Sequence, residues 1–392
     1  MPPIKSGLEK FIANPPTGLE GQRLGLLCNP ASVDRNYCHA KDLIQQRFPG
    51  RLTTLFSPQH GFYSEKQDNM VESGDLRDPE TGLTVFSLYG DTRVPTVPMF
   101  DRLDTLLIDL QDAGTRVYTF AATMSYCLET ARDMDKQILV LDRPNPANGI
   151  QVEGNRLKHP FASFVGRYPI PMRHGLTLGE YARYINTANG IGCRLEVIPM
   201  HGWRRWMYFS DTGLPWIPPS PNLPTVQSAM VYPGQVIFEG TNISEGRGTT
   251  TPFEIFGAPF IDPDKIAGFM GGRHFPGGVL RPVAFEPMFH KFQHENCRGV
   301  HLHITDPGAY NAYQTSLKLM QAVMYHYPEK FEWRAPPYEY EWEKLPIDLI
   351  LGDAAIRERI ERFEPVEAIE TDWLTDLADF QKEIQPFLLY EP

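Results

Sequence analysis

The chain has 392 residues and a formal net charge of −11 at pH 7. This charge repels nucleic acid and anionic membrane surfaces, and no dense run of Lys and Arg overcomes it. Apolar residues make up 42% and charged residues 22%, as in ordinary globular proteins, and no apolar run approaches the length of a membrane span. We therefore expect a soluble protein with neither a nucleic-acid partner nor a membrane partner.

The absence of several sequence motifs disfavours the classes of site that depend on them. Five cysteines are scattered without a Cys-x-x-Cys pair, which argues against a disulfide framework and a structural zinc site. No His-Glu-x-x-His pattern occurs, so we expect no catalytic metal. The lack of a dinucleotide-binding or Walker loop disfavours a nucleotide site, and the lack of a Gly-x-Ser-x-Gly elbow disfavours a serine hydrolase. Residues 1–11 include no apolar signal core, from which we expect a cytoplasmic protein.

The first half alternates short apolar strands with helical stretches. Strands are expected at 24–28, 52–56, 84–88, 105–110 and 137–141. Apolar residues at helical spacing over 123–134 predict a helix that crosses between the last two strands. This alternation is typical of a Rossmann-like parallel sheet covered by helices.

The regular alternation of strands and helices ends in the second half of the chain. A capping box at Thr177–Glu180 begins a helix to about Ala188, and five prolines follow between 215 and 224. Beyond them we expect strands at 231–239 and 300–304 and helices at 309–327, 353–363 and 371–387. A chain of this length exceeds one hydrophobic core. We predict a Rossmann-like α/β domain over residues 1–200 and a smaller α+β auxiliary domain over 201–392, with a cleft at their interface.

Four of the five expected strands of the first half end in a polar, turn-rich segment. The segments are 29–32, 57–61, 111–116 and 142–146. In open α/β sheets the ligand crevice lies outside the carboxyl ends of the strands, so these segments should converge on one site. In 142–146 the prolines present Asp142, Arg143 and Asn145 rigidly, although such residues also commonly bond their own backbone.

Carboxyl groups at strand ends were considered as the acid and base of glycoside hydrolysis. Glu239 closes an expected apolar strand, and Glu245 lies in a loop whose glycines allow close approach to a ligand. The alternatives for this loop are an ion pair between Glu245 and Arg247 or a glycine-rich phosphate nest. Asp109 ends a central strand and either completes a polar pocket or caps the next helix.

Seven sequence runs together resemble the NamZ-type exo-β-N-acetylmuramidases. They cover 58–61, 89–93, 109–119, 141–146, 164–171, 219–222 and 239–249, in the same order as in the family. The resemblance extends over about residues 20–390. It implies a Rossmann-like domain plus an auxiliary domain, with the active site between them. It also implies release of N-acetylmuramic acid from the non-reducing end of a muropeptide or muramic-acid disaccharide, without a cofactor.

One departure from the family concerns its proposed catalytic glutamate. Family members commonly read Pro-Glu-His-Gly where this chain has Pro58-Gln59-His60-Gly61. A glutamine amide cannot exchange a proton as a carboxyl group does, so either another acid acts or hydrolysis is impaired. Glu65 is close enough in sequence to be a substitute.

These observations lead to a candidate site. We expect Glu239 or Glu245 as general acid, with Asp109 or Glu65 as base or nucleophile across the cleft. The lactyl carboxylate of the sugar would be held by Arg143, Arg173 or Arg247. The full set of expected substrate-binding residues is Gln59, His60, Asp112, Arg116, Tyr118, Asp142, Arg143, Asn145, Arg173, His174, Asn242 and Arg247. The alternatives are a non-catalytic muramic-sugar-binding protein and a glycosidase for another acidic or N-acetylated sugar.

Overall fold

Two sheets organise the chain in this computed structural model, which describes residues 3–392. The larger sheet has seven strands in the order β3-β4-β2-β1-β5-β6-β9, and all neighbours pair in parallel except β3 with β4. Its strands are β1 (Leu24–Cys28), β2 (Leu52–Ser57), β3 (Leu76–Arg77), β4 (Thr84–Ser87), β5 (Thr105–Asp109), β6 (Gln137–Leu141) and β9 (Arg194–Ile198).

Helices cover both faces of this sheet because its central strands are apolar on both sides. Leu24 and Leu26 pack with α1 (Gly7–Ala13) and α2 (Ala40–Arg47), whereas Leu27 belongs to the core beneath α3 (Val97–Phe100), α4 (Phe120–Asp133) and α5 (Leu178–Ala188). Continuous apolar strands are typical of such doubly covered sheets. The strand order reverses between β1 and β5, and a ligand crevice is expected at such a point.

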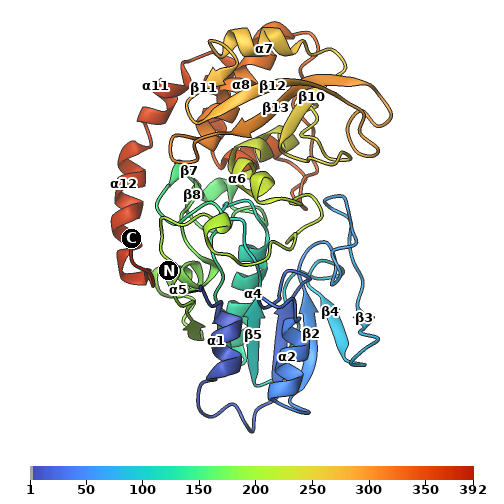
Figure 1. Ribbon diagram of the computed structural model, residues 1–392, viewed down its shortest axis with the longest axis vertical. Coiled ribbons are helices and arrows are strands. Elements are labelled where there is room, and N and C mark those ends of the chain that lie inside the picture. Colours follow the sequence, from blue (N-terminus) through green and yellow to red (C-terminus); the bar gives the residue numbers. More distant parts are fainter. Residues whose placement is uncertain (1–2) are drawn as a thin grey trace.

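The second sheet is antiparallel and lies at the opposite end of the molecule (Figure 1). Its order is β10-β13-β12-β11, formed by Ile255–Ala258, Cys297–Ile304, Gly278–Phe285 and His274–Phe275. The helices α7 (Pro263–Phe269) and α8 (Ala312–His326) pack with it. A two-stranded sheet of β7 (Glu153–Arg156) and β8 (Pro171–Arg173) lies between the two ends. The predicted fold class, a Rossmann-like sheet with a smaller α+β part, is confirmed.

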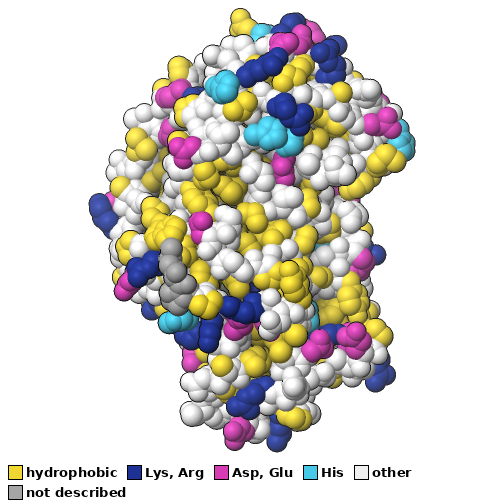
Figure 2. All heavy atoms as spheres, viewed as in Figure 1, with side chains coloured by type: hydrophobic (Ala, Val, Ile, Leu, Met, Phe, Trp, Pro, Cys, Tyr) yellow, Lys and Arg dark blue, Asp and Glu magenta, His cyan; other side chains and the backbone are white. Residues whose placement is uncertain are grey.

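The remaining helices connect these parts. They are α6 (Val226–Gln235), α9 (Pro346–Leu351), α10 (Ala354–Glu361), α11 (Val366–Thr371) and α12 (Leu374–Glu383), with short 3₁₀ turns η1 (His159–Phe161), η2 (Phe209–Asp211), η3 (Val236–Gly240) and η4 (Gln385–Phe387). Basic and acidic side chains are interspersed over the face seen in Figure 2. Within residues 3–392, none of the helices combines the length and apolar character needed to cross a bilayer.

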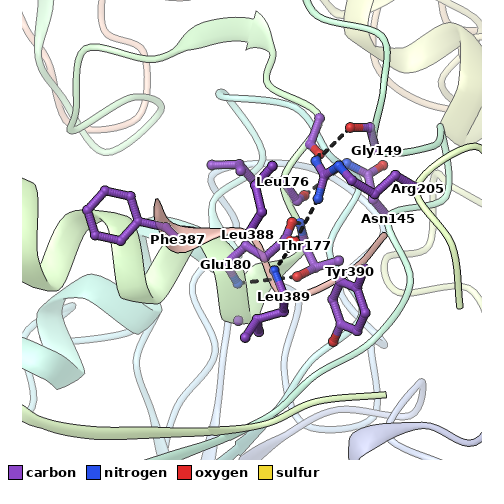
Figure 3. Close-up of polar contacts among 12 residues, drawn as sticks. Asn145, Gly149, Leu176, Thr177, Glu180, Arg205, Phe387, Leu388, Leu389 and Tyr390 are labelled. Atoms are coloured by element: carbon purple, nitrogen blue, oxygen red, sulfur yellow. Dashed lines mark hydrogen bonds and ion pairs between the residues drawn. The ribbon is translucent and has the colours of Figure 1, made fainter. Parts of the chain in front are cut away.

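The C-terminal segment returns to the first sheet. Helix α12 runs along one side of the molecule toward α5, and the two ends of the chain lie close together (Figure 1). The Leu389 amide donates to Glu180 at 2.9 Å (Figure 3). The Tyr390 hydroxyl donates to Asp142. Glu180 also forms a buried ion pair with Arg205 at 2.6 Å. The last residues therefore complete the packing around α5.

Two sequence predictions were wrong in their secondary structure. The segment 231–239 is not a strand but the second half of α6 followed by η3, and the predicted helix 371–387 is interrupted at Trp373. A short buried apolar run does not distinguish a strand from an enclosed helix. Here Thr225 caps α6 through the Ser228 amide, and a Cβ at Gly234 would lie 2.0 Å from the Ala312 carbonyl oxygen of α8. Close packing between α6 and α8 therefore decides the conformation.

Candidate active site

A pocket is lined by residues from both halves of the chain. The residues that line it are Gln59, His60, Asn69, Val117, Tyr118, Thr119, Phe120, Val165, Ser220, Tyr232, Glu239, Arg247, Phe253, Tyr338 and Glu339. Those numbered up to 165 follow strands β2 and β5 or belong to nearby loops, and the others come from the second half of the chain. The site is thus built from segments far apart in sequence.

The wall nearest the parallel sheet follows strand β2. Gln59 accepts a hydrogen bond from the Thr119 hydroxyl at 2.6 Å, which joins the loops that follow β2 and β5. His60 has a left-handed backbone, with φ of 78°, and its Nδ1 lies 2.8 Å from the Lys66 carbonyl oxygen. Burial, together with the charge of Arg247, lowers the pKa of His60 to about 4. His60 is therefore a neutral hydrogen-bonding group at neutral pH.

Glu239, which the sequence analysis proposed as a catalytic carboxyl group, lines the pocket. It lies in η3 and is buried, and it receives three hydrogen bonds. Arg247 donates to Oε1 at 2.6 Å, while Asn69 and the Tyr338 hydroxyl donate to Oε2 at 3.1 and 2.7 Å. These three donors fix the orientation of the Glu239 carboxyl group at the pocket wall.

Glu339 is a second carboxyl group in the pocket, one that sequence analysis missed. The Gln59 amide donates to its Oε1 at 3.1 Å, and the Tyr89 hydroxyl donates to its Oε2 at 2.7 Å. Burial raises the pKa of Glu339 to about 7, and the negative charge of Glu239 adds to this effect. The pocket therefore holds two carboxyl groups in different electrostatic environments.

Glu245 lies behind the pocket wall and does not line it. Its side chain is fully buried, with Lys291 at 2.7 Å, Arg247 at 3.3 Å and His290 at 3.5 Å. Burial alone would raise the pKa of Glu245, but these positive charges outweigh it and hold the pKa at about 2. Glu245 is an ionised support for Arg247, which resembles the ion-pair alternative considered from the sequence.

Two of the three arginines considered for an anion clamp are occupied elsewhere. Arg143 binds both carboxylate oxygens of Asp109, at 2.5 and 2.8 Å, at the carboxyl end of β5. Arg173 is paired with Glu153 between β7 and β8. Arg247 differs from both because it lines the pocket, and its buried Nη1 has no hydrogen-bond partner within residues 3–392. The Nε of Arg173 also lacks a partner in that part of the chain, but Arg173 does not line the pocket. Of these three arginines, Arg247 is therefore the one placed beside the pocket.

The other predicted residues hold loops and helices rather than the pocket wall. Asp142 accepts from Thr177 and from the Gly179 amide at the start of α5, and Asn145 donates to the Leu176 carbonyl oxygen (Figure 3 labels Asn145, Leu176 and Thr177). Burial raises the pKa of Asp142 to about 6. Asn242 bonds the backbone of residues 330 and 332.

Four predicted site residues have not yet been placed, namely Arg116, Asp112, His174 and Glu65. Arg116 donates to four buried carbonyl oxygens, those of Asn155, Ile170, Ile350 and Leu351. Asp112 accepts from the Gly114 amide at 2.7 Å and lies 4.0 Å from His174, and burial raises the pKa of Asp112 to about 7. Glu65 is exposed. None of the four lines the pocket.

The residues that sequence analysis missed share one property. Asn69, Tyr232, Tyr338 and Glu339 reach the pocket only through tertiary packing, and none belongs to a polar segment directly after a strand of the parallel sheet. Ser220 lies within the run 219–222 and also lines the pocket. Among residues 3–392 no three His, Cys, Asp or Glu side chains gather into a metal-binding cluster.

A parallel sheet joined to an antiparallel one, with carboxyl groups and an arginine in a pocket lined from both halves of the chain, defines a two-part α/β protein with a candidate active site. Two family models match the chain, described as "Exo-beta-N-acetylmuramidase NamZ, N-terminal" over residues 24–227 and the corresponding C-terminal model over residues 230–390. The chain belongs to the NamZ exo-β-N-acetylmuramidase family.

Relatives support this membership along the whole chain. It is 40% identical to the peptidoglycan β-N-acetylmuramidase NamZ of Bacillus subtilis (strain 168), over 99% of this chain and 92% of that protein. A crystal structure of a DUF1343 family protein from Bacteroides fragilis NCTC 9343 matches with a TM-score of 0.87 and 34% identity, covering 99% of both chains. A second DUF1343 family protein of that organism matches with a TM-score of 0.73, 28% identity and the same coverage.

Proposed function

We propose that this protein is an exo-acting glycoside hydrolase that releases N-acetylmuramic acid from the non-reducing end of peptidoglycan fragments. The observation that carries the proposal is the pocket itself, which Glu239, Glu339 and Arg247 line together. Membership of the NamZ family supports the sugar. A pocket, unlike an open groove, suits the removal of one terminal residue.

Arg247 gives the proposed specificity. N-Acetylmuramic acid carries a lactyl carboxylate that glucosamine lacks, and a free guanidinium N–H in a buried pocket can form a charge-assisted bond with it. Arg247 also holds Glu239, so the Arg247→Met variant will lose activity on every substrate. The informative quantity is the ratio of kcat/KM between muramic and glucosamine substrates. An unchanged ratio would refute the assignment.

The direct test is a panel of chromogenic glycosides that share one aryl leaving group. We expect turnover of the N-acetyl-β-muramide and much slower turnover of the N-acetyl-β-glucosaminide and β-glucoside. The Glu239→Gln variant should lose about 100-fold or more in kcat, the scale typical of a lost acid–base or electrostatic group. Preference for another sugar would indicate a different glycosidase.

A non-catalytic sugar-binding protein remains the second candidate because Gln59 occupies the position of the family's proposed catalytic glutamate. Tight binding of muramic sugars without turnover would favour it. We further propose a cytoplasmic location with imported muropeptides as substrates. The exposed thiol of Cys38 suits a reducing compartment, and cell fractionation tests this point.

A further inference from the structure

We propose that Glu339 is the general acid that protonates the leaving group, with Gln59 positioning it. This inference rests on the proposed glycosidase function. The Glu339 proton passes to the bridging oxygen as the bond between that oxygen and the anomeric carbon breaks. Water adds to the anomeric carbon and returns one proton to Glu339, so the products are a free sugar and an alcohol, and the carboxyl group is restored.

The first support is the position of Glu339 beside Gln59. Glu339 is 4% exposed and lines the pocket, and its Oε1 is 3.1 Å from the Gln59 amide nitrogen. A carboxyl group in this chain thus lies one hydrogen bond away from the side chain that replaces the family's glutamate. Gln59 cannot supply a proton, but it can orient a neighbour that does.

The second support is the backbone that presents Glu339. Tyr338 and Glu341 exchange two backbone hydrogen bonds, at 2.9 and 3.0 Å, around a tight turn. Both central residues are left-handed, with φ of 44° at Glu339 and 68° at Tyr340. Such turns favour Asn and Gly, and other residues adopt this backbone conformation only with strain. Strain of this kind is characteristic of functional positions, and here it directs a carboxyl group into the pocket.

The third support is the contrast between the two carboxyl groups. Glu239 bonds a cationic donor, Arg247, whereas the hydrogen-bond donors of Glu339 are the neutral Gln59 and Tyr89. Arg93 is the cation that opposes protonation of Glu339, and Glu239 and burial favour it, so that its pKa is about 7. The two carboxyl groups of the pocket thus differ in their hydrogen-bond donors, and Glu339 is the one whose surroundings suit a proton donor near neutral pH.

Two substrates with different leaving groups test whether Glu339 acts as the general acid. Protonation matters for a sugar leaving group and hardly at all for 4-nitrophenolate, which departs as a stable anion. For Glu339→Gln we expect kcat on a muramic-acid disaccharide to fall about 100-fold or more, and on the 4-nitrophenyl muramide less than about 10-fold. Glu72→Gln, an exposed neighbour that accepts a bond from Tyr340, is the matched control and should leave both rates unchanged.

Equal losses on the two substrates would overturn the acid role while leaving the glycosidase function intact. Wild-type protein that turns over no glycoside of the panel would overturn both proposals. If Glu339→Gln does not fold, Tyr89→Phe provides the decision. Removing this donor from the carboxylate should move the alkaline limb of the wild-type pH–rate profile to higher pH, and an unmoved limb would contradict the proposal.

Discussion

Arg143 binds Asp109 through two parallel hydrogen bonds beside the point where the strand order of the central sheet reverses, between β1 and β5. The distances are 2.5 and 2.8 Å, and both side chains are buried. This arrangement uses the guanidinium group that could have held a substrate carboxylate. Arg143 therefore stabilises the carboxyl end of β5, a role that differs measurably from substrate binding.

The Arg143→Met variant should lose about 3–5 kcal/mol of unfolding free energy, because it leaves the Asp109 carboxylate buried without its partner. Urea denaturation measures the loss. The control is Arg23→Met, whose pair with Asp104 is half-exposed and should contribute less than about 1 kcal/mol. A stable Arg143 variant with a raised KM for muramic substrates alone would show instead that Arg143 binds the sugar.

Glu245 gives a pH-dependent prediction. Its folded pKa of about 2 lies below the ordinary value of 4.5, so its stabilising effect is full above pH 4.5 and disappears as the pH falls toward 2. Glu245→Gln should therefore be clearly less stable than wild type at pH 7, and the difference should narrow between pH 5 and 3. Thermal unfolding at each pH provides the measurement. A constant difference would show that Glu245 is not ionised over this range.

Glu339 gives the opposite dependence. Its folded pKa of about 7 is above the ordinary 4.5, so the folded protein retains a proton that the unfolded chain releases, and wild-type stability declines as the pH rises from 4.5 through 7. Glu339→Gln lacks this penalty. Relative to wild type, it should gain on the order of 2–4 kcal/mol between pH 5 and 8. Parallel stability curves for the two proteins would contradict the buried-acid description.

Arg116 should affect stability and leave substrate affinity unchanged. Its guanidinium serves four buried carbonyl oxygens, two of them at the end of α9, and each unsatisfied buried group costs about 1–3 kcal/mol. We expect Arg116→Met to be destabilised by at least about 3 kcal/mol with an unchanged KM in the surviving folded protein. Arg132→Met, on the exposed side of α4, is the control. An increase in KM without destabilisation would place Arg116 in the sugar site.

The parallel sheet could be read from the sequence because its strands are buried on both faces. Strands β1 and β6 begin and end at the predicted residues, since a continuous apolar run between polar turns has few other solutions. The segment 231–239 is also buried and mainly apolar, yet it is helical because Thr225 caps α6 and α6 packs against α8.

The candidate site, like the fold, is predictable from the sequence only in part. Gln59, His60, Tyr118, Glu239 and Arg247 were predicted from motifs and line the pocket. Glu339 lies 280 positions from Gln59, and no pattern around Tyr338 or Tyr340 marks it as a pocket residue. Conversely, Asp142 and Asn145 have the polar, rigid display typical of a binding loop, yet they satisfy backbone groups of their own domain. Sequence reveals which side chains can perform chemistry, and packing decides which of them face the pocket.

The contacts of Leu389 and Tyr390 also make the start of α5 dependent on a segment that is remote in sequence. The Leu389 amide completes the hydrogen bonding of Glu180 across 209 positions, and the Tyr390 hydroxyl donates to Asp142. A protein cut off before Leu389 would leave both buried carboxyl groups short of a donor, so a truncation far along the chain would loosen a helix of the parallel sheet.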